Sequence, residues 1–261
     1  MQLADFLSHD VDPSDPASRD PEFIRTVALP AFDALRTYYF RSEIEGVENV
    51  PRQGPFFAVA NHNGGPLLPD CWVLVSYWWS ALGPERPAYA MVHDAALRVP
   101  LLRTFLVKVG GLRASPENAE KVLGLGAPLL VYPGGELDCL KSFWRRHTID
   151  FHGRTGFIEV ALRLGVPILP VVNVGGHEVY FTVFSSQRLA RWSGLSRLTR
   201  VKTVPLPSAC HGASGSRAFC RTSRCRRSSS TASARPSSSD TTRTLLATGG
   251  SCAQRMRESQ G

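Results

Sequence analysis

Residues 56–70 have the sequence Phe-Phe-Ala-Val-Ala-Asn-His-Asn-Gly-Gly-Pro-Leu-Leu-Pro-Asp, in which an apolar run ends abruptly in a polar loop. Five consecutive apolar residues bounded by turn formers predict a buried strand. His62 follows this strand at its carboxyl end, the edge at which open α/β sheets bind their ligands. Asp70 begins the next apolar segment, which we expect to be a helix that runs to about Leu82.

His62 and Asp70 are the first candidates for catalysis. A loop rich in Gly and Pro can fold the carboxylate back to the imidazole, and a carboxylate that fixes one tautomer makes histidine an effective general base. Two simpler explanations stand beside this one, because loop histidines are commonly solvated and Asp is a common residue at helix starts. His93-Asp94 also ends an apolar run and is the competing pair.

The rest of the chain alternates between predicted helices and strands. Helices are expected over 23–40, 70–82, 100–109, 116–124 and 155–164, and strands over 56–60, 87–92, 128–132 and 166–174. Pro30 should kink the first helix, Ser115-Pro116 is typical of a helix start, and Pro170 indicates an edge strand or a bend. This order predicts the α/β class, with a mostly parallel sheet flanked by helices.

We expect a single folded domain over residues 21–207. A chain of 261 residues is long enough to bury one good core. Residues 1–20 are acidic and rich in Pro and Ser, so we expect them to be disordered and not to form a secretory signal. No uninterrupted apolar span of 18 residues occurs, and we therefore expect a cytoplasmic protein that rests on the membrane face as a peripheral or monotopic protein.

The formal net charge of +8 does not indicate a nucleic-acid partner, because most of it lies in one segment. Residues 208–261 hold nine Arg, no Lys, one Asp and one Glu, a net of +7, so residues 1–207 carry only +1. The cysteines divide likewise, since only Cys71 and Cys139 precede residue 208. Their spacing indicates neither a disulfide framework nor a zinc site, and no metal is expected.

Four segments in order carry a family resemblance. Residues 46–51 (GVENVP) lead into Asn61-His62, and they are followed by 111–119 (GLRASPENA), 132–136 (YPGGE) and 166–171 (VPILPV). Together they resemble the glycerolipid acyltransferase family, which includes bacterial 1-acylglycerol-3-phosphate acyltransferases and, more distantly, diacylglycerol acyltransferases. The fourth segment alone is unspecific, whereas the ordered set is specific.

This resemblance implies transfer of a fatty acyl group from a thioester to a hydroxyl of a lysophospholipid or acylglycerol. The donor would be acyl-CoA or an acyl-carrier protein, with no further cofactor, and the acceptor would be a lipid. His62 would be the general base and Asp70 its partner. Asp70 lies eight residues after His62, where the commonest family motif places the acid four residues on, so their pairing is an inference.

The third segment also departs from the commonest family pattern. Residues 133–136 (PGGE) stand where Glu-Gly-Thr-Arg is usual, and they are closer to the neutral-lipid acyltransferases. We expect Gly134, Gly135 and Glu136 to form the pocket floor beside His62, because adjacent strands end at one sheet edge. Backbone N–H groups of Gly134-Gly135, or of residues 64–65, are candidates to face the oxyanion, although glycine pairs more often form simple turns.

Phosphate and membrane contacts are expected from other parts of the chain. With the usual motif arginine missing, Arg113 or Arg154 would bind an acceptor phosphate, although Arg154 fits a surface position at a helix start equally well.

The predicted helix over 23–40 and the aromatic cluster over 72–79 are the candidate membrane surfaces. Packing in the core is the alternative for both segments and the favoured one for the aromatic cluster. On the first helix, one side is expected to carry Ile24, Val27, Ala31, Leu35, Tyr38 and Tyr39.

Other functions stay open at this point. No Gly-x-Ser-x-Gly elbow occurs, which argues against an acyl-serine intermediate and against an esterase. Neither a P-loop nor a His-Glu-x-x-His zinc helix is present, and His177-Glu178 completes no such motif. A non-catalytic lipid-binding protein and a damaged acyltransferase paralogue are the remaining alternatives.

Residues 208–261 are expected to be a disordered tail. Thirteen of them are Ser and nine are Arg, with no Ile, Val, Tyr or Trp, so the segment cannot bury enough apolar surface to offset its ordering entropy. A basic RNA-binding tail is the functional alternative, but the segment lacks Lys and has one aromatic residue, Phe219. Because the strand-like pattern stops abruptly after Pro205, we infer a reading-frame shift near residues 205–210.

Nucleotide sequencing of the gene tests this inference. We expect a +1 or −1 frame downstream of the codon for Pro205 to restore apolar strand and helix periodicity. If neither frame does so, the segment is encoded as it stands and the inference is wrong.

Overall fold

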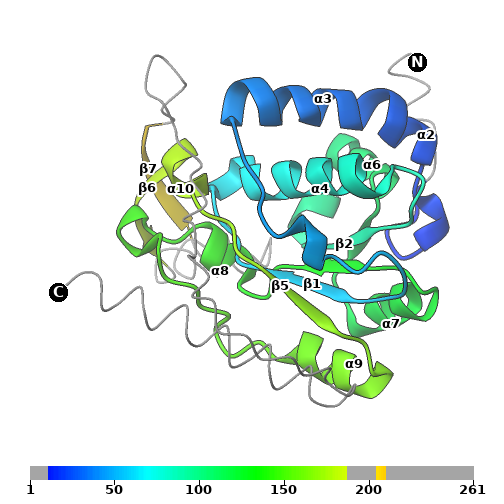
Figure 1. Cartoon of the computed structure of the whole chain (residues 1–261). Coiled ribbons are helices and arrows are strands. Elements are labelled where there is room, and N and C mark those ends of the chain that lie inside the picture. The colour runs from blue at the N-terminus through cyan, green and yellow to red at the C-terminus, as the bar shows by residue number, and fades with distance from the viewer. Residues whose placement is uncertain (1–10, 187–203, 210–261) are drawn as a thin grey trace, which may run out of the picture.

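Five parallel strands form the central sheet, in the order β3-β2-β4-β1-β5 (Figure 1). The computed structural model describes residues 11–186 and 204–209. Strands β1 to β5 span Phe57–Ala60, Tyr89–Val92, Gly111–Arg113, Leu129–Val131 and Ile168–Val171. A separate antiparallel pair consists of β6 (Phe181–Ser186) and β7 (Val204–Ala209). The predicted α/β class with a mostly parallel sheet is confirmed.

Helices cover both faces of this sheet (Figure 1). Helices α4 (Pro69–Leu82) and α6 (Pro100–Lys108) lie on one face, and α7 (Pro116–Gly124) and α9 (Gly156–Leu164) lie on the other. Three short helices lie in the connections: α5 (Asp94–Leu97), α8 (Gly135–Cys139) and α10 (Gly176–Val179). An N-terminal helix packs on α4 as an outer layer, and it comprises α2 (Pro21–Phe23), α3 (Leu29–Ala34) and π-helical turns over 24–28 and 35–40.

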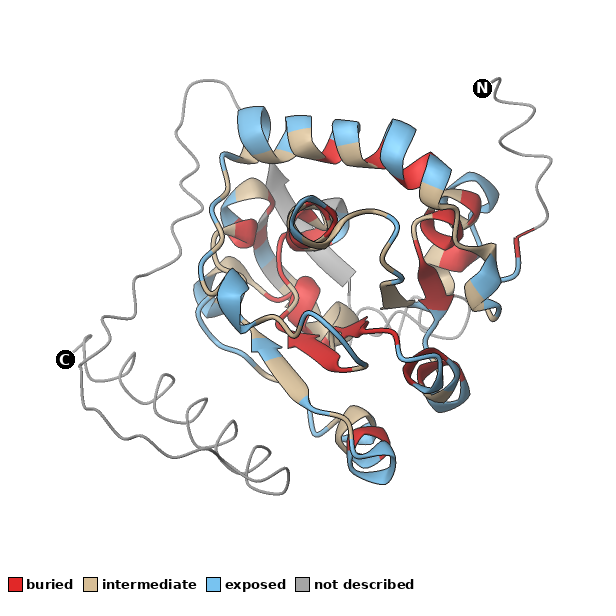
Figure 2. Ribbon diagram, turned by 45° about the vertical axis from the view of Figure 1, so that its right-hand side comes forward, coloured by how far each residue is buried: buried red, intermediate tan, exposed pale blue. Residues whose placement is uncertain are grey.

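Strand β1 supplies side chains to the cores on both faces of the sheet. Phe57 and Val59 face the cluster formed with α7 and α9, while Phe56, Ala58 and Ala60 face α4. All five side chains are buried, and Figure 2 shows buried residues along the central strands. A strand that is covered on both faces must be apolar at every position, which explains the uninterrupted run in the sequence.

The carboxyl end of β1 lies between the carboxyl ends of two neighbouring strands. Val59 pairs with Val131 of β4, and Ala60 pairs with Val171 of β5. The chain leaves β1 through α4 on one face of the sheet and leaves β4 through α9 on the other. Open α/β sheets bind their ligands at such a point, where the connections diverge.

Most of the predicted elements are present, with ends that differ by one to three residues. The Ser115 hydroxyl caps α7 by accepting the Asn118 N–H at 3.2 Å, and Pro170 lies on β5 at the edge of the five-stranded sheet, as its missing N–H requires. Strand β3 and helix α5 were not predicted, because three or four residues are too few to show a period.

Residues 11–20, which we expected to be disordered, instead pack against the domain. Val11 is buried, the Arg19 guanidinium donates to the Pro84 carbonyl, and Asp20 forms an ion pair with Lys108 at 3.2 Å. These contacts, both apolar and polar, join positions far apart in sequence, so composition could not reveal them. Residues 1–10 lie outside the described residues.

Most of the apolar side expected on the N-terminal helix is exposed, and only Ile24 of that side is buried. The helix continues through Pro30, and a π-helical turn on either side changes the spacing of its side chains from the regular period of 3.6 residues. The side chains of Phe23, Ile24, Ala28 and Phe32 are buried, whereas those of Val27, Ala31, Leu35, Tyr38 and Tyr39 are exposed. An apolar strip on this helix is therefore open to solvent.

The C-terminal boundary lies slightly further along than expected. Strand β7 continues to Ala209, two residues beyond the predicted end of the domain at 207. Residues 210–261 of the predicted tail lie outside the described residues. Of the helices that the structure describes, none has the length and hydropathy needed to span a bilayer.

Candidate active site

The loop after β1 reverses the chain through three left-handed residues. Gly64, Gly65 and Leu68 have φ of 87°, 61° and 49°. A Cβ on Gly64 would lie 2.3 Å from the ring of Pro69, and a Cβ on Gly65 would lie 2.3 Å from the ring of Tyr180. Glycine is required at both positions, and the reversal returns the start of α4 to the end of β1.

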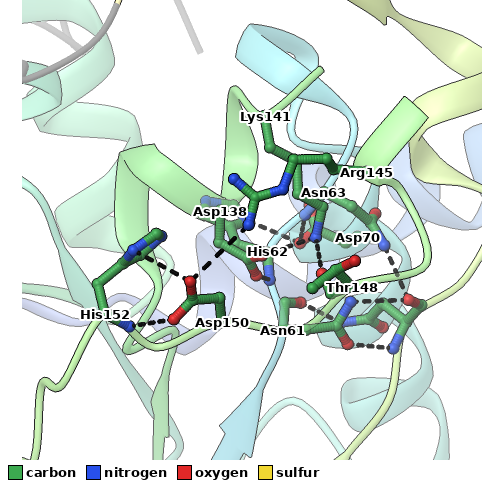
Figure 3. Close-up of polar contacts among 11 residues, drawn as sticks. Asn61, His62, Asn63, Asp70, Asp138, Lys141, Arg145, Thr148, Asp150 and His152 are labelled. Atoms are coloured by element: carbon green, nitrogen blue, oxygen red, sulfur yellow. Dashed lines mark hydrogen bonds and ion pairs between the residues drawn. The ribbon is translucent and has the colours of Figure 1, made fainter. Parts of the chain in front are cut away.

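This reversal brings the His62 imidazole and the Asp70 carboxylate together (Figure 3). His62 Nδ1 lies 2.6 Å from Asp70 Oδ2, and the same oxygen accepts the Asn63 N–H at 3.0 Å. The Asp70 side chain is 1% exposed and the His62 side chain 13%. The carboxylate is thus shielded from water and engages Nδ1 of the imidazole, and the Cys139 thiol also contacts His62.

The surroundings of His62 favour its protonated form. Burial by itself lowers the pKa of the imidazole, but the Asp70 carboxylate and the Cys139 thiol outweigh burial and hold the pKa well above 6.5. The ring of Tyr132 stacks on the imidazole with centroids 4.4 Å apart. An imidazolium formed by proton abstraction is therefore stabilised here and held in one orientation.

Three asparagines join the ends of β1 and β5. The Asn173 carbonyl accepts the side-chain N–H groups of Asn61 and Asn63 at 2.9 and 2.8 Å, and the Asn173 N–H donates to Asn61 Oδ1 at 2.7 Å. The Asn173 side chain returns a bond to the Asn61 carbonyl at 3.1 Å. The residues on either side of His62 are therefore fixed to the neighbouring strand (Figure 3).

A buried ion pair holds the backbone of His62. Asp138 Oδ2 accepts the His62 N–H at 2.7 Å, and Asp138 Oδ1 lies 2.7 Å from Lys141 Nζ, which also donates to the Thr148 carbonyl at 2.6 Å. Both charged side chains are buried. This pair was not predicted from the sequence, although an acid and a lysine three residues apart after a predicted buried strand were a usable signal.

The glycine turn after β4 lies beside His62, where we expected it. A Cβ on Gly134 would lie 2.4 Å from Asp138 Cβ, so this glycine gives Asp138 the space to reach His62. Gly135 has φ of 51°, and its N–H donates to the Tyr132 carbonyl at 3.0 Å. The turn itself therefore uses the Gly135 N–H, which was one of the candidate oxyanion donors, and this agrees with the simpler alternative of a glycine turn.

Glu136 and Arg154 pair with each other at this turn. Arg154 Nη2 lies 3.3 Å from Glu136 Oε1, and Arg154 Nη1 donates to the Pro133 carbonyl at 3.1 Å. Arg154 therefore fastens the turn to the start of α9, and its charge is already opposed by a carboxylate. A phosphate bound by Arg154 would have to compete with Glu136.

The structure does not bring Arg113 next to His62. Arg113 ends β3, which is separated from β1 by β2 and β4, so three strand spacings of about 4.8 Å place it about 14 Å away. Its side chain is 53% exposed, and its Nε lies 3.6 Å from Asp94 Oδ1. The competing histidine, His93, accepts the Ala95 N–H at 3.1 Å and so caps α5.

Both described cysteines belong to this region. Donor atoms of His62, Asp70 and Cys71 all lie within 4.8 Å of one another, so these residues are the candidate metal ligands in the part of the chain that the structure describes. His62 Nδ1 is engaged by Asp70, and burial raises the pKa of the Cys71 thiol well above its usual value. Burial also raises the pKa of Cys139, whose thiol donates to the Gly65 carbonyl at 3.1 Å. Protonated thiols are poor ligands and poor nucleophiles.

Comparison with known proteins gives the family. Residues 41–174, just over half of the chain, match the model of the family described as Acyltransferase, and this span includes β1 to β5 and His62. The chain belongs to this family. The resemblance to glycerolipid acyltransferases is thereby confirmed, and no solved structure matches the chain significantly.

Relatives of this acyltransferase-family chain include proteins from mycobacteria and from animals. An uncharacterized protein of Mycobacterium tuberculosis is 32% identical over 191 residues, which are 72% of this chain and 52% of that protein. An uncharacterized protein of Mycobacterium leprae is 30% identical over the same share of this chain and 51% of its own length. Human diacylglycerol O-acyltransferase 2 is 30% identical over 99 residues, 36% of this chain and 26% of that enzyme. The chain spans about half the length of the mycobacterial relatives.

The ion pair that holds His62 predicts a specific pattern of stability and activity. Asp138→Asn should lower the free energy of unfolding by about 3–5 kcal/mol, because it leaves Lys141 buried without a counter-charge. Asp138→Asn combined with Lys141→Met should recover most of this loss and keep an acceptor for the His62 N–H. Denaturant unfolding measures the stabilities of the variants.

Asp138→Leu combined with Lys141→Met is the matched control. This variant is also uncharged but has no acceptor for the His62 N–H, so it should be stable and poorly active in acyl transfer. The explanation fails if the Asn/Met variant is as unstable as Asp138→Asn alone, or if the Leu/Met variant is fully active.

Proposed function

We propose that this chain transfers a fatty acyl group from a thioester to a hydroxyl of a lipid acceptor, with His62 as the general base and Asp70 as its partner. The 2.6 Å contact between His62 Nδ1 and Asp70 Oδ2, at the ligand-binding edge of an acyltransferase-family sheet, is the observation that carries the proposal. The donor is acyl-CoA or an acyl-carrier-protein thioester, and the acceptor is an acylglycerol or a lysophospholipid.

The reaction needs one base and no covalent enzyme intermediate. His62 Nε2 takes the proton of the acceptor hydroxyl while the hydroxyl oxygen adds to the thioester carbonyl carbon. The tetrahedral intermediate then breaks its carbon–sulfur bond, and the departing sulfur takes the proton from His62. Asp70 stabilises the imidazolium between these two proton transfers, as the acid of a Ser-His-Asp triad does.

The ion pairs of the two candidate phosphate-binding arginines favour an acceptor without a phosphate. Arg154 is opposed by Glu136, and Arg113 lies about three strand spacings from His62 and pairs with Asp94. The partial similarity to human diacylglycerol O-acyltransferase 2 supports the same preference. We therefore place acylglycerols ahead of lysophosphatidate, and a mixture of both acceptors with one acyl-CoA, read by lipid mass spectrometry, distinguishes them.

Substitution at His62 and Asp70 tests the mechanism. His62→Ala should lower kcat by about 10²–10⁴-fold, the usual contribution of a general base. Asp70→Asn should lower it by at least about 10²-fold, because the amide cannot stabilise the imidazolium. Wild-type turnover by a folded His62→Ala variant would instead support a non-catalytic lipid-binding protein.

The pH profile supplies a second readout for the same pair. The base must be neutral, and its pKa is raised, so wild-type kcat/KM should fall on the acidic side with a midpoint above 6.5. Asp70→Asn removes the charge that raises the pKa and should move this midpoint to lower pH. An unchanged midpoint would show that Asp70 does not raise the pKa of the base.

The exposed strip on the N-terminal helix is the proposed membrane surface. Its residues Val27, Leu35, Tyr38 and Tyr39 are 41%, 39%, 79% and 44% exposed. The aromatic cluster on α4 does not take part, because Trp79 is buried and Trp72 and Trp78 pack against it. We propose peripheral attachment at the cytoplasmic face of a membrane, and the apolar strip and lipid substrates support attachment to a membrane surface.

Vesicle flotation tests this attachment. The wild-type protein should float with phospholipid vesicles, and a variant with Leu35→Ser and Tyr38→Ser should remain in solution, while turnover of a detergent-solubilised acceptor is retained. The matched control is Leu125→Ser, just after the end of α7, which changes a leucine that is 67% exposed on the opposite side of the sheet. Equal flotation of all three proteins would overturn the assignment of the surface.

A further inference from the structure

A second histidine lies at the same sheet edge as His62. His177 belongs to α10, which follows β5, and β5 pairs directly with β1. The side chain is only 2% exposed. The motif around His177 matches no metal-binding pattern, so the sequence suggested no task for this residue.

Helix α10 packs directly on the loop that carries His62. A Cβ on Gly176 would lie 1.9 Å from Asn63 Oδ1, and a Cβ on Gly64 would lie 3.1 Å from the Gly176 carbonyl. On its other side, Glu178 forms an ion pair with Arg146 at 3.5 Å. The position of His177 is therefore fixed with respect to His62.

Neither ring nitrogen of His177 has a hydrogen-bond partner, although both are buried. Buried polar groups are almost always paired, and an unpaired one is typical of a site that is completed by a ligand. Burial, together with the charges of Lys141 and His62, lowers the pKa of His177 to about 3. The ring is neutral, so it offers one N–H donor and one acceptor nitrogen.

Acyl transfer requires a hydrogen-bond donor for the carbonyl oxygen. This oxygen becomes negative when the acceptor adds to the thioester. A preorganised donor aimed at it usually raises the rate by about 10²–10³-fold. The N–H of Gly135, one of the candidates for this role, donates to the Tyr132 carbonyl instead. His177 is a buried donor on the helix that packs against the His62 loop, and neither of its ring nitrogens has a hydrogen-bond partner.

We propose that His177 is a catalytic residue that donates its ring N–H to the thioester carbonyl oxygen as this oxygen becomes an oxyanion. The proposal rests on the acyl transfer proposed above. The oxyanion forms as the acceptor proton moves to His62, and it collapses to the product ester carbonyl when the carbon–sulfur bond breaks. His177 keeps its proton throughout, and the positive imidazolium of His62 adds to the stabilisation of the negative oxygen.

Two substitutions of His177 separate this role from simple packing. His177→Leu removes the donor and leaves an apolar group of similar volume, and His177→Gln keeps an N–H. We expect His177→Leu to lower kcat by about 10²-fold or more, with KM for acyl-CoA within a few-fold of wild type and a Tm equal to or above wild type. His177→Gln should keep more activity than His177→Leu. His147→Leu, the same change at an exposed histidine, is the control and should behave as wild type.

A non-reactive thioether analogue of acyl-CoA gives a readout without catalysis. The analogue has no thioester carbonyl, so both His177 variants should bind it with wild-type affinity. Wild-type kcat in His177→Leu would overturn the proposal, and so would equal losses of Tm and activity in both variants. If wild-type protein is active and His62→Ala is not, either of these two outcomes refutes the role of His177 and leaves the proposed function standing. If wild-type protein transfers no acyl group, the proposed function fails and the role of His177 fails with it.

Discussion

One buried carboxylate oxygen organises the candidate site. Asp70 Oδ2 contacts the imidazole nitrogen of His62 and accepts the N–H of Asn63, so it fixes a side chain and the backbone that follows. The contact depends on the left-handed turn at Gly64 and Gly65, which returns α4 to the end of β1. It also depends on a shielded position, because the same pair in water would be far weaker.

Two further layers of polar contacts keep that pair in place. On the β5 side, the asparagine contacts of Asn173 fix the backbone around His62, and on the β4 side Asp138 accepts the His62 N–H. Because the base is held from both neighbouring strands, little of its orientational freedom remains to be lost when a substrate binds. The same packing confines the unpaired imidazole of His177 beside it, which is why we assign that residue to the reaction.

The fold and the central pair could be predicted from the sequence because their signals are local. An apolar run for β1, helix-start chemistry at Ser115 and the loop from His62 to Asp70 each lie within about 15 residues, a span over which chain periodicity is informative. His177 could not be assigned a role in this way, and the only local signal for Asp138 was its spacing from Lys141. Their tasks arise only when strands far apart in sequence end at one edge, and when an expected donor such as the Gly135 N–H is used by its own turn.

The central claim is that the Asp70 carboxylate raises the proton affinity of the base. An NMR titration of the His62 ring nitrogens, in wild-type protein and in Asp70→Asn, tests it without a substrate. We expect His62 to titrate well above 6.5 in the wild type and at a clearly lower pH in the variant. A His62 that titrates at the same pH in both proteins would contradict it.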